Sequence, residues 1–180
     1  AGMEGVFISN VVEHVPDRTS NVHVKEQKRL FQKNLENYHS SKEDFQIVSK
    51  ISFNYGSSWH KLTAPVTDSE GKPYPTCEKK SEIKLSCNLH LWGMTSGKHE
   101  IISKRKAIGL ILANGNVGPH LSHRIYTQNS QNNNASEEVN LFLSRDGGLT
   151  WRELRKGEHT FNIGDHGGIF IIAKKNESTN

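Results

Sequence analysis

The sequence predicts an all-β fold built from repeated units, namely a segment of a β-propeller with about two and a half four-stranded blades. Short apolar runs introduced by glycine recur along the chain, and a Ser-x-Asp-x-Gly-x-Thr-Trp turn occurs once in full and once in a weaker form. Hydrophobic residues make up only 33% of the 180 residues. This composition suits many short strands joined by polar loops better than a helical core.

Five segments have the patterns of strands. Three consist of a glycine followed by a continuous apolar run rich in β-branched residues, as in strands that are buried on both faces. These are Gly5–Ser9, Gly109–Ala113 and Gly168–Ala173. The other two, Phe45–Ile51 and Val139–Leu143, alternate in polarity and follow the first two runs. The same order of strand types therefore occurs twice.

A tight turn and a Trp-bearing strand follow each alternating strand. The turn Ser144–Trp151 has the full pattern, called an Asp box, and Ser52–Trp59 is a weaker copy. Asp or Asn accepts hydrogen bonds from turn amides, Gly tolerates positive φ, and Trp covers a large apolar area between sheets. We therefore expect a structural and not a catalytic role for the defining residues, which are Ser144, Asp146, Gly148, Thr150, Trp151, Ser52, Asn54, Gly56 and Trp59.

The number of blades follows from counting strands. The two box tryptophans lie about 90 residues apart, which by length alone corresponds to two blades of about 40 to 45 residues each. Between the boxes, however, only four strands are recognisable: Ser86–Trp92, the Gly109 run, the Val139 strand and the Trp151 strand. These complete one blade, and the surplus length falls in loops, notably 63–86 and 114–138.

A further blade begins with His159–Ile163 and the Gly168 run. Each blade of a propeller buries its apolar faces only when both neighbours are present. We therefore expect the segment to have two uncovered faces.

The charge argues against a nucleic-acid partner, and the cysteines and sequons favour the secretory pathway. The net charge is +4, but the Lys and Arg residues are scattered and partly offset by Glu, so we do not expect nucleic-acid binding. No signal peptide and no apolar run of about 20 residues is present. Cys77 and Cys87 are too few for a metal site without help from His and would pair in an oxidising compartment. Two N-glycosylation sequons begin at Asn134 and Asn176.

An ordered set of motifs resembles the sortilin-type receptors of the vacuolar protein sorting class, whose luminal region is a ten-bladed propeller. The resemblance covers most of the chain and rests on the segments 2–8, 51–62, 87–91, 108–118, 157–159 and 164–168. Gly71–Pro73, ahead of Cys77, is most similar to the SorCS subgroup.

The resemblance implies a type I membrane receptor that binds peptides, propeptides or soluble proteins and carries them between Golgi, endosome and cell surface. Neuropeptides, growth factors and hydrolases belong to that ligand class. The rest of the propeller and a second receptor copy are further expected partners. A transmembrane helix and a sorting tail would lie beyond Asn180. No ligand-binding residue, metal or cofactor is carried over.

The resemblance also implies a disulfide between Cys77 and Cys87 in a loop, 63–86, of the propeller. Two free buried thiols are the alternative. The segment 10–44 departs from the family, where this connection is commonly much shorter. Within it, Lys25–Tyr38 places apolar side chains at helical spacing between charged flanks. A solvated or disordered loop is one interpretation, and a helix that docks a partner or a second subunit is the other.

Two other functional classes compete with a receptor. Asp boxes also occur in sialidases and related glycosidases, which need a pair of carboxylates or a Tyr nucleophile with its own acid. A sialidase also needs an arginine cluster, and the arginines here show no such pattern, so we do not expect an enzyme. A structural or adhesive module is the second alternative. His90, His159 and His166 are interpreted as structural, with sensing of endosomal pH as the alternative role.

Overall fold

The computed structural model describes residues 2–14, 45–74, 87–92, 101–122 and 139–175. The chain divides into two units, one made of Ala1–Val11 with Ile47–Asn180 and the other of Val12–Gln46. The larger unit contains the Asp-box hairpins and the other sites described below. The helix expected at Lys25–Tyr38 lies outside the described residues.

All regular structure in the described part of the chain is strand, apart from one short 3-10 turn. The strands are β1 (Phe7–His14), β2 (Phe45–Ser52), β3 (His60–Thr63), β4 (Asn88–Leu91), β5 (Ile101–Ile102), β6 (Ile111–Gly118), β7 (Asn140–Ser144), β8 (Arg152–Arg155), β9 (His159–Gly164) and β10 (Ile169–Lys174), and the turn is η3 (Asp165–Gly167). The predicted all-β class is confirmed.

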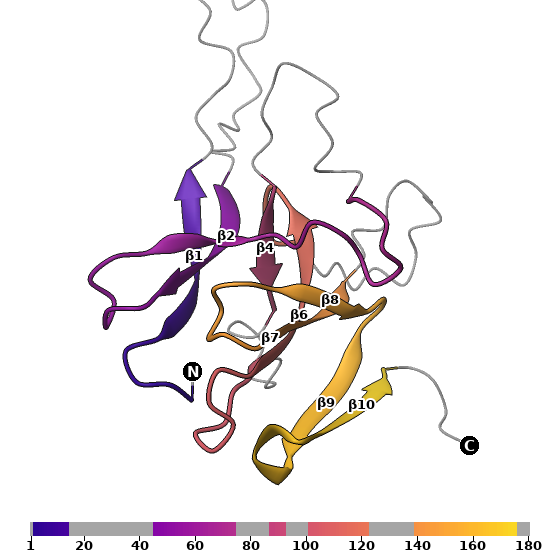
Figure 1. Cartoon of the computed structure of the whole chain (residues 1–180). Helices are drawn as coiled ribbons and strands as arrows, with labels where there is room; N and C mark the ends of the chain where they lie inside the picture. Colours follow the sequence, from indigo (N-terminus) through magenta and orange to yellow (C-terminus); the bar gives the residue numbers. More distant parts are fainter. Residues whose placement is uncertain (1, 15–44, 75–86, 93–100, 123–138, 176–180) are drawn as a thin grey trace, which may run out of the picture. The chain divides into compact units, whose positions relative to one another are not determined.

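The strands form one large sheet and one hairpin (Figure 1). The sheet has the order β1-β2-β3-β4-β6-β7-β8, with β5 paired to β6, and β9 pairs with β10. Every pairing with a described register is antiparallel. The run β4-β6-β7-β8 contains the four strands that the sequence groups into one blade. A short pairing, Leu62 with Leu89 and Thr63 with Asn88, joins β3 to this run. The arrangement agrees with a propeller segment, and the blade count stays a prediction.

Strands β6 and β7 bury side chains on both faces of the sheet. Successive side chains of a strand point to opposite faces, and here both sets are apolar. One set enters a first core and consists of Ile111, Ala113 and Phe142. The other set enters a second core and consists of Leu112, Leu141 and Leu143. The continuous apolar runs that predicted these strands therefore reflect burial on two sides.

Each core is completed by a different neighbour. Ile51 of β2 and Leu62 of β3 close the first core together with Trp151. Ile163 of β9 lies in the second core, and Phe170 of β10 packs against it. The four-strand run β4-β6-β7-β8 thus lies between β2 and β3 on one face and the β9–β10 hairpin on the other.

Strand β6 is longer than the apolar run that predicted it, because it continues to Gly118 through a segment assigned to the loop 114–138. That segment was counted as surplus loop length, but its residues 115–118 pair with β4. Asn114 bonds to the backbone N–H and C=O of His159, at 3.1 and 2.8 Å. A Cβ at Gly115 would lie 2.1 Å from the carbonyl oxygen of His90, so only glycine fits there.

Two other boundaries differ from expectation. Strand β1 runs to His14 and so enters the range 10–44 assigned to the insertion. The segment Asn-Val-Val-Glu-His in that range includes two β-branched valines, which extend a strand readily. Strand β5, Ile101–Ile102, was not predicted, because two residues are too few to establish a periodicity.

One face of the β9–β10 hairpin exposes apolar side chains of β10. Side chains of β10 alternate: Phe170 and Ile172 pack against the second core, whereas Ile169 and Ile171 are 54% and 64% exposed. We therefore predict that the 180-residue chain, expressed alone, aggregates or stays partly unfolded. Size-exclusion chromatography and a thermal melt followed by circular dichroism test this. A monomeric species with one cooperative transition would contradict it.

The Asp-box hairpins and the residues around them

The full Asp box joins β7 to β8 through a network centred on two side chains. Ser144 Oγ accepts a hydrogen bond from the N–H of Gly148 at 2.8 Å and donates to Asp146 Oδ1 at 2.8 Å. The Asp146 carboxylate accepts from the N–H of Thr150 at 2.9 Å and from its hydroxyl at 2.5 Å. Trp151 Nε1 donates to the carbonyl oxygen of Gly148 at 3.0 Å. The turn thus satisfies its own polar groups.

Two glycines let this turn pack against the body of the sheet. Gly147 and Gly148 have φ values of 77° and 98°, in the left-handed region that other residues rarely adopt. The N–H of Gly147 donates to the carbonyl oxygen of Gly109 at 2.9 Å. A Cβ at Gly148 would lie 2.4 Å from Ile51 Cδ1. The hairpin is therefore seated directly on a side chain of the neighbouring strand β2.

The weaker box, between β2 and β3, repeats the network with different residue types. Gly56 N–H donates to Ser52 Oγ at 2.9 Å, and Ser58 N–H donates to Asn54 Oδ1 at 2.9 Å. Asn54 Nδ2 donates to Ser58 Oγ at 2.9 Å, so the amide reverses the direction of one bond. Tyr55 takes the place of Gly147 with φ of 59°.

The tryptophans of the two boxes differ in burial. Trp151 is 7% exposed and belongs to the first core, whereas Trp59 is 39% exposed. The expectation that each tryptophan covers apolar area between sheets therefore agrees with the burial of Trp151 and stays a prediction for Trp59. The two differ because Trp151 has β2 and β3 against it, while no described strand covers Trp59 to the same extent.

The Asp146 carboxylate is bound within its own hairpin. Desolvation acts to raise its pKa, but the hydrogen bonds from Thr150 and Ser144 outweigh it and hold the pKa below its usual range. Within the described residues, no group of three or more His, Cys, Asp or Glu side chains is placed to hold a metal ion. We infer that the box acts as a structural clasp.

The lowered pKa of Asp146 predicts a local dependence on acid. A carboxylate whose folded pKa is depressed adds stability above its unfolded pKa of about 3.9, and this contribution is lost as pH falls through the folded pKa. Asp146→Ala should loosen the turn by about 1 kcal/mol, because Thr150 loses its acceptor. Asp146→Asn should cost less stability, because Asn54 makes the equivalent hydrogen bonds in the weaker box.

Hydrogen exchange of the peptide spanning 144–151, in the whole protein and corrected for intrinsic rates, measures both effects. Protection in the wild type should fall between about pH 5 and pH 3, and the Asn variant should lack that fall. Equal protection of the Ala and Asn variants would contradict the role assigned to the side-chain acceptor.

Glu153 is a buried carboxylate that sequence reasoning missed. It is 4% exposed and accepts from the N–H and hydroxyl of Ser69, at 3.0 and 2.8 Å, and from Asn140 Nδ2 at 2.9 Å. The Tyr74 hydroxyl donates to the same carboxylate. Burial, followed by this bond, raises the pKa of Tyr74. Glu153 thus holds the turn 69–74 against β7 and β8. It lies two residues after Trp151, so the two side chains lie on the same face of the strand. This alternation is a signal in the sequence that could have identified Glu153 as buried.

Removing this carboxylate should release the turn. Glu153→Ala leaves four hydrogen-bond donors, on Ser69, Tyr74 and Asn140, without their acceptor, and we expect a loss of roughly 2–3 kcal/mol in stability, the usual penalty for unsatisfied groups. Glu153→Gln keeps one carbonyl oxygen as an acceptor and should therefore lose less stability. Limited proteolysis of the whole protein, with cleavage near residues 69–74 identified by mass spectrometry, reports the release. Unchanged cleavage in the Ala variant would contradict this role.

The three singled-out histidines lie in separate surroundings. His90 is buried, with Nδ1 accepting from the N–H of Ser49 at 3.1 Å and Nε2 lying 3.1 Å from the carbonyl oxygen of Gly118. His159 Nδ1 lies 2.8 Å from the carbonyl oxygen of Gly157. His166 is exposed, and its Nδ1 lies 3.8 Å from Asp165, beyond hydrogen-bonding distance. The geometry brings none of them together as a catalytic group.

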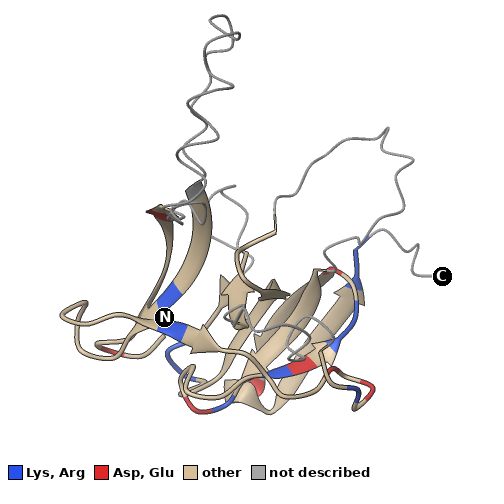
Figure 2. Ribbon diagram, turned by 90° about the horizontal axis from the view of Figure 1, so that it is seen from above, with Lys and Arg blue, Asp and Glu red and all other residues tan. Residues whose placement is uncertain are grey.

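The other predicted sites fall mainly outside the described residues. Cys87 is disulfide-bonded, and no described cysteine is free. Cys77 lies outside the described part of the chain, so its pairing with Cys87 stays a prediction, and so do the sequons at Asn134 and Asn176. Across the described ranges, no helix is long and apolar enough to cross a membrane. Figure 2 shows basic and acidic residues distributed over several segments.

The fold and its hairpins define a β-sheet protein of the Asp-box repeat class. A family model described as Sortilin-Vps10, "Sortilin, neurotensin receptor 3", matches residues 1–180. The chain therefore belongs to the Sortilin-Vps10 family. The nearer assignment to the SorCS subgroup stays a prediction.

The relatives that this chain matches are proteins many times longer than the chain itself. An uncharacterized membrane glycoprotein of Saccharomyces cerevisiae is 36% identical over 180 residues, which are 99% of this chain and 13% of that protein. The vacuolar protein sorting/targeting protein PEP1 of the same species is 34% identical over 99% of this chain and 9% of its own length. Vacuolar protein sorting/targeting protein 10 of Pyrenophora teres is 33% identical over 99% of this chain and 10% of its own length. The chain thus spans about a tenth of these relatives.

Proposed function

We propose that this chain is part of the luminal, ligand-binding propeller of a type I membrane sorting receptor. In this proposal the receptor binds peptides, propeptides or soluble proteins and carries them between Golgi, endosomes and cell surface. The observation that carries it is membership of the Sortilin-Vps10 family, together with relatives that are named for vacuolar protein sorting.

Features of the described residues support a receptor over an enzyme. The Asp146 and Glu153 carboxylates are both engaged in holding turns. A glycosidase would need such groups directed at one sugar site. The disulfide at Cys87 agrees with an oxidising compartment, as the luminal location requires. The four-strand run between two neighbours is the packing that a ring of blades requires.

The function is tested in cells that produce the full-length protein. Deletion of its gene should raise the fraction of vacuolar or lysosomal hydrolases that is secreted into the medium, as measured by immunoblot, and the wild-type gene should restore retention. Unchanged secretion of every hydrolase tested, with no propeptide retained selectively by the immobilised ectodomain, would favour a structural or adhesive module instead. Hydrolysis of a fluorogenic sialoside by the ectodomain would favour a glycosidase.

A further inference from the structure

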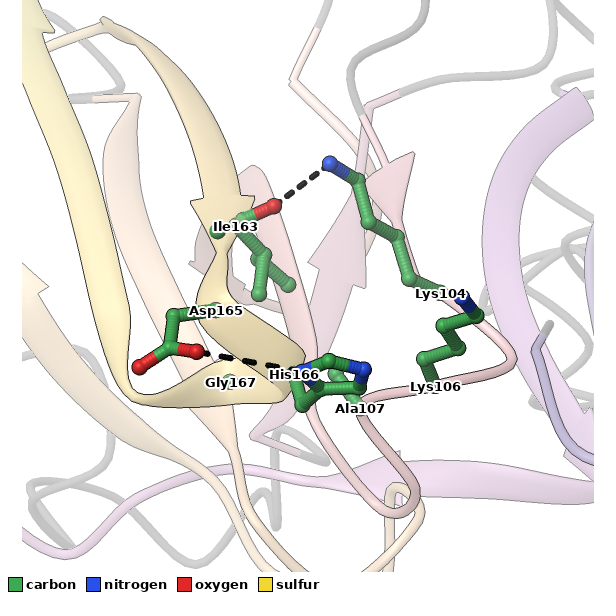
Figure 3. A pocket seen from close by; sticks show the side chains of 8 residues that line it. Lys104, Lys106, Ala107, Ile163, Asp165, His166 and Gly167 are labelled. Carbon is green, nitrogen blue, oxygen red and sulfur yellow. Dashed lines mark hydrogen bonds and ion pairs between the residues drawn. The ribbon is translucent and has the colours of Figure 1, made fainter.

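A small pocket lies between η3 and the basic turn Lys104–Ala107, two segments that are distant in the sequence (Figure 3). Its volume is about 320 Å³, enough for one side chain or one chain end. Ala107 and Ile163, both 2% exposed, provide an apolar floor.

The two segments are packed tightly enough to fix the walls of the pocket. Gly167 has φ of 104°, and a Cβ at this position would lie 2.5 Å from Leu110 Cδ1 and 3.4 Å from Ala107 Cβ. Only glycine permits this approach of η3 to the sheet.

Among the described residues, no acidic side chain pairs with the lysines at the rim. Lys104 Nζ donates to Asn162 Oδ1 at 2.7 Å and to the carbonyl oxygen of Ile163 at 2.5 Å, and both acceptors are neutral. Lys106 makes no hydrogen bond or ion pair with any described residue. The lining contains one carboxylate, that of Asp165, which lies beside His166 and points away from the two lysines in Figure 3. The lysine side of the pocket therefore favours an anion.

The backbone of η3 is strained at the same place. Asp165 and His166 have φ values of 42° and 52°, so two consecutive residues with side chains adopt the left-handed region. Such conformations persist only where surrounding structure imposes them, and they concentrate at ligand sites. The strain presents the His166 ring at the rim of the pocket.

We propose that this pocket binds a carboxylate carried by a protein or peptide ligand, with Lys106 as the main anchor and Lys104 as the second. The site deepens the receptor function proposed above and rests on it. Two ammonium groups above an apolar floor suit a single carboxylate on an aliphatic stem, because the stem contacts Ala107 and Ile163. A phosphate, with three strong acceptor oxygens, needs more donors than the lining offers.

The test uses three fluorescein-labelled peptides that differ only in their carboxylates, titrated against the secreted whole ectodomain by fluorescence polarisation. The first is Gly-Leu-Glu-Leu-Gly amide, the second is its Gln counterpart as the amide, and the third is the Gln peptide with a free C-terminus. The Glu peptide should bind about tenfold more tightly than the Gln amide, the effect of one hydrogen bond to a charged group. Tight binding of the free acid as well would show that a chain end can also supply the carboxylate.

Substitutions locate the binding in the pocket. Lys106→Ala should abolish the preference for the Glu peptide, and Lys106→Arg should retain most of it. Arg152→Ala is the matched control, because Arg152 is exposed, has no partner among the described residues and lies outside the pocket. Equal affinity of all three peptides, no binding up to millimolar concentration, or an equal loss in the Lys106→Ala and Arg152→Ala variants would overturn the proposal.

The same variants separate this proposal from the receptor function. An ectodomain that retains propeptides selectively but shows no carboxylate preference contradicts the pocket alone. An ectodomain that retains no propeptide contradicts the receptor function. Circular dichroism of the Lys106→Ala ectodomain controls for folding, and retained binding by Lys106→Arg provides a second check.

Discussion

The structure depends on the burial of β6 and β7 on both faces. Ile111 and Leu112 are adjacent in the chain, yet they enter different cores on opposite sides of the sheet. A strand with two apolar faces is stable only when each face has a covering layer. The four-strand run therefore specifies its two neighbours, β2 and β3 on one side and β9 and β10 on the other. The repeated order of strands along the chain has this physical cause.

The polar residues of the sheet are compatible with this two-sided burial because their partners come from the neighbouring strands. Asn114 bonds to the backbone of β9 through both amide atoms, and Glu153 gathers donors from a turn and from β7. Unsatisfied polar groups at such depth would be strongly destabilising. The Asp boxes contribute in the same way, since their side chains satisfy the turn amides and Gly148 seats one turn on Ile51. Apolar packing and the hydrogen bonding of buried polar groups thus favour the same arrangement of strands.

Much of this fold was predictable from local sequence. Glycine followed by a continuous apolar run indicated β6 and β10, and the Asp-box spacing indicated both hairpins, because these patterns act over a few residues. The second half of β6 was not predictable in this way, since Asn114 and Gly115 resemble a turn until their partners in β9 and β4 are known. Trp59 also differs from Trp151 only through its surroundings.

The candidate pocket was beyond sequence reasoning for the same reason. Lys106 and His166 come from different turns, and no local pattern places them together. The motif around Gly167 was recognisable, but its close approach to Leu110 depends on the packing of the second core. Glu153 is an intermediate case: the alternation after Trp151 indicated its face, whereas its four donors come from elsewhere in the chain.

We expect every apolar sheet face of this chain to be covered by a neighbouring sheet in the whole protein. Ile171, now 64% exposed on β10, tests this expectation most directly. In the intact ectodomain, the thiol introduced by Ile171→Cys should react with a maleimide far more slowly than the thiol introduced by Leu149→Cys on the exposed Asp-box turn, with the unsubstituted protein as the baseline. Equal labelling rates in the folded protein would contradict the account.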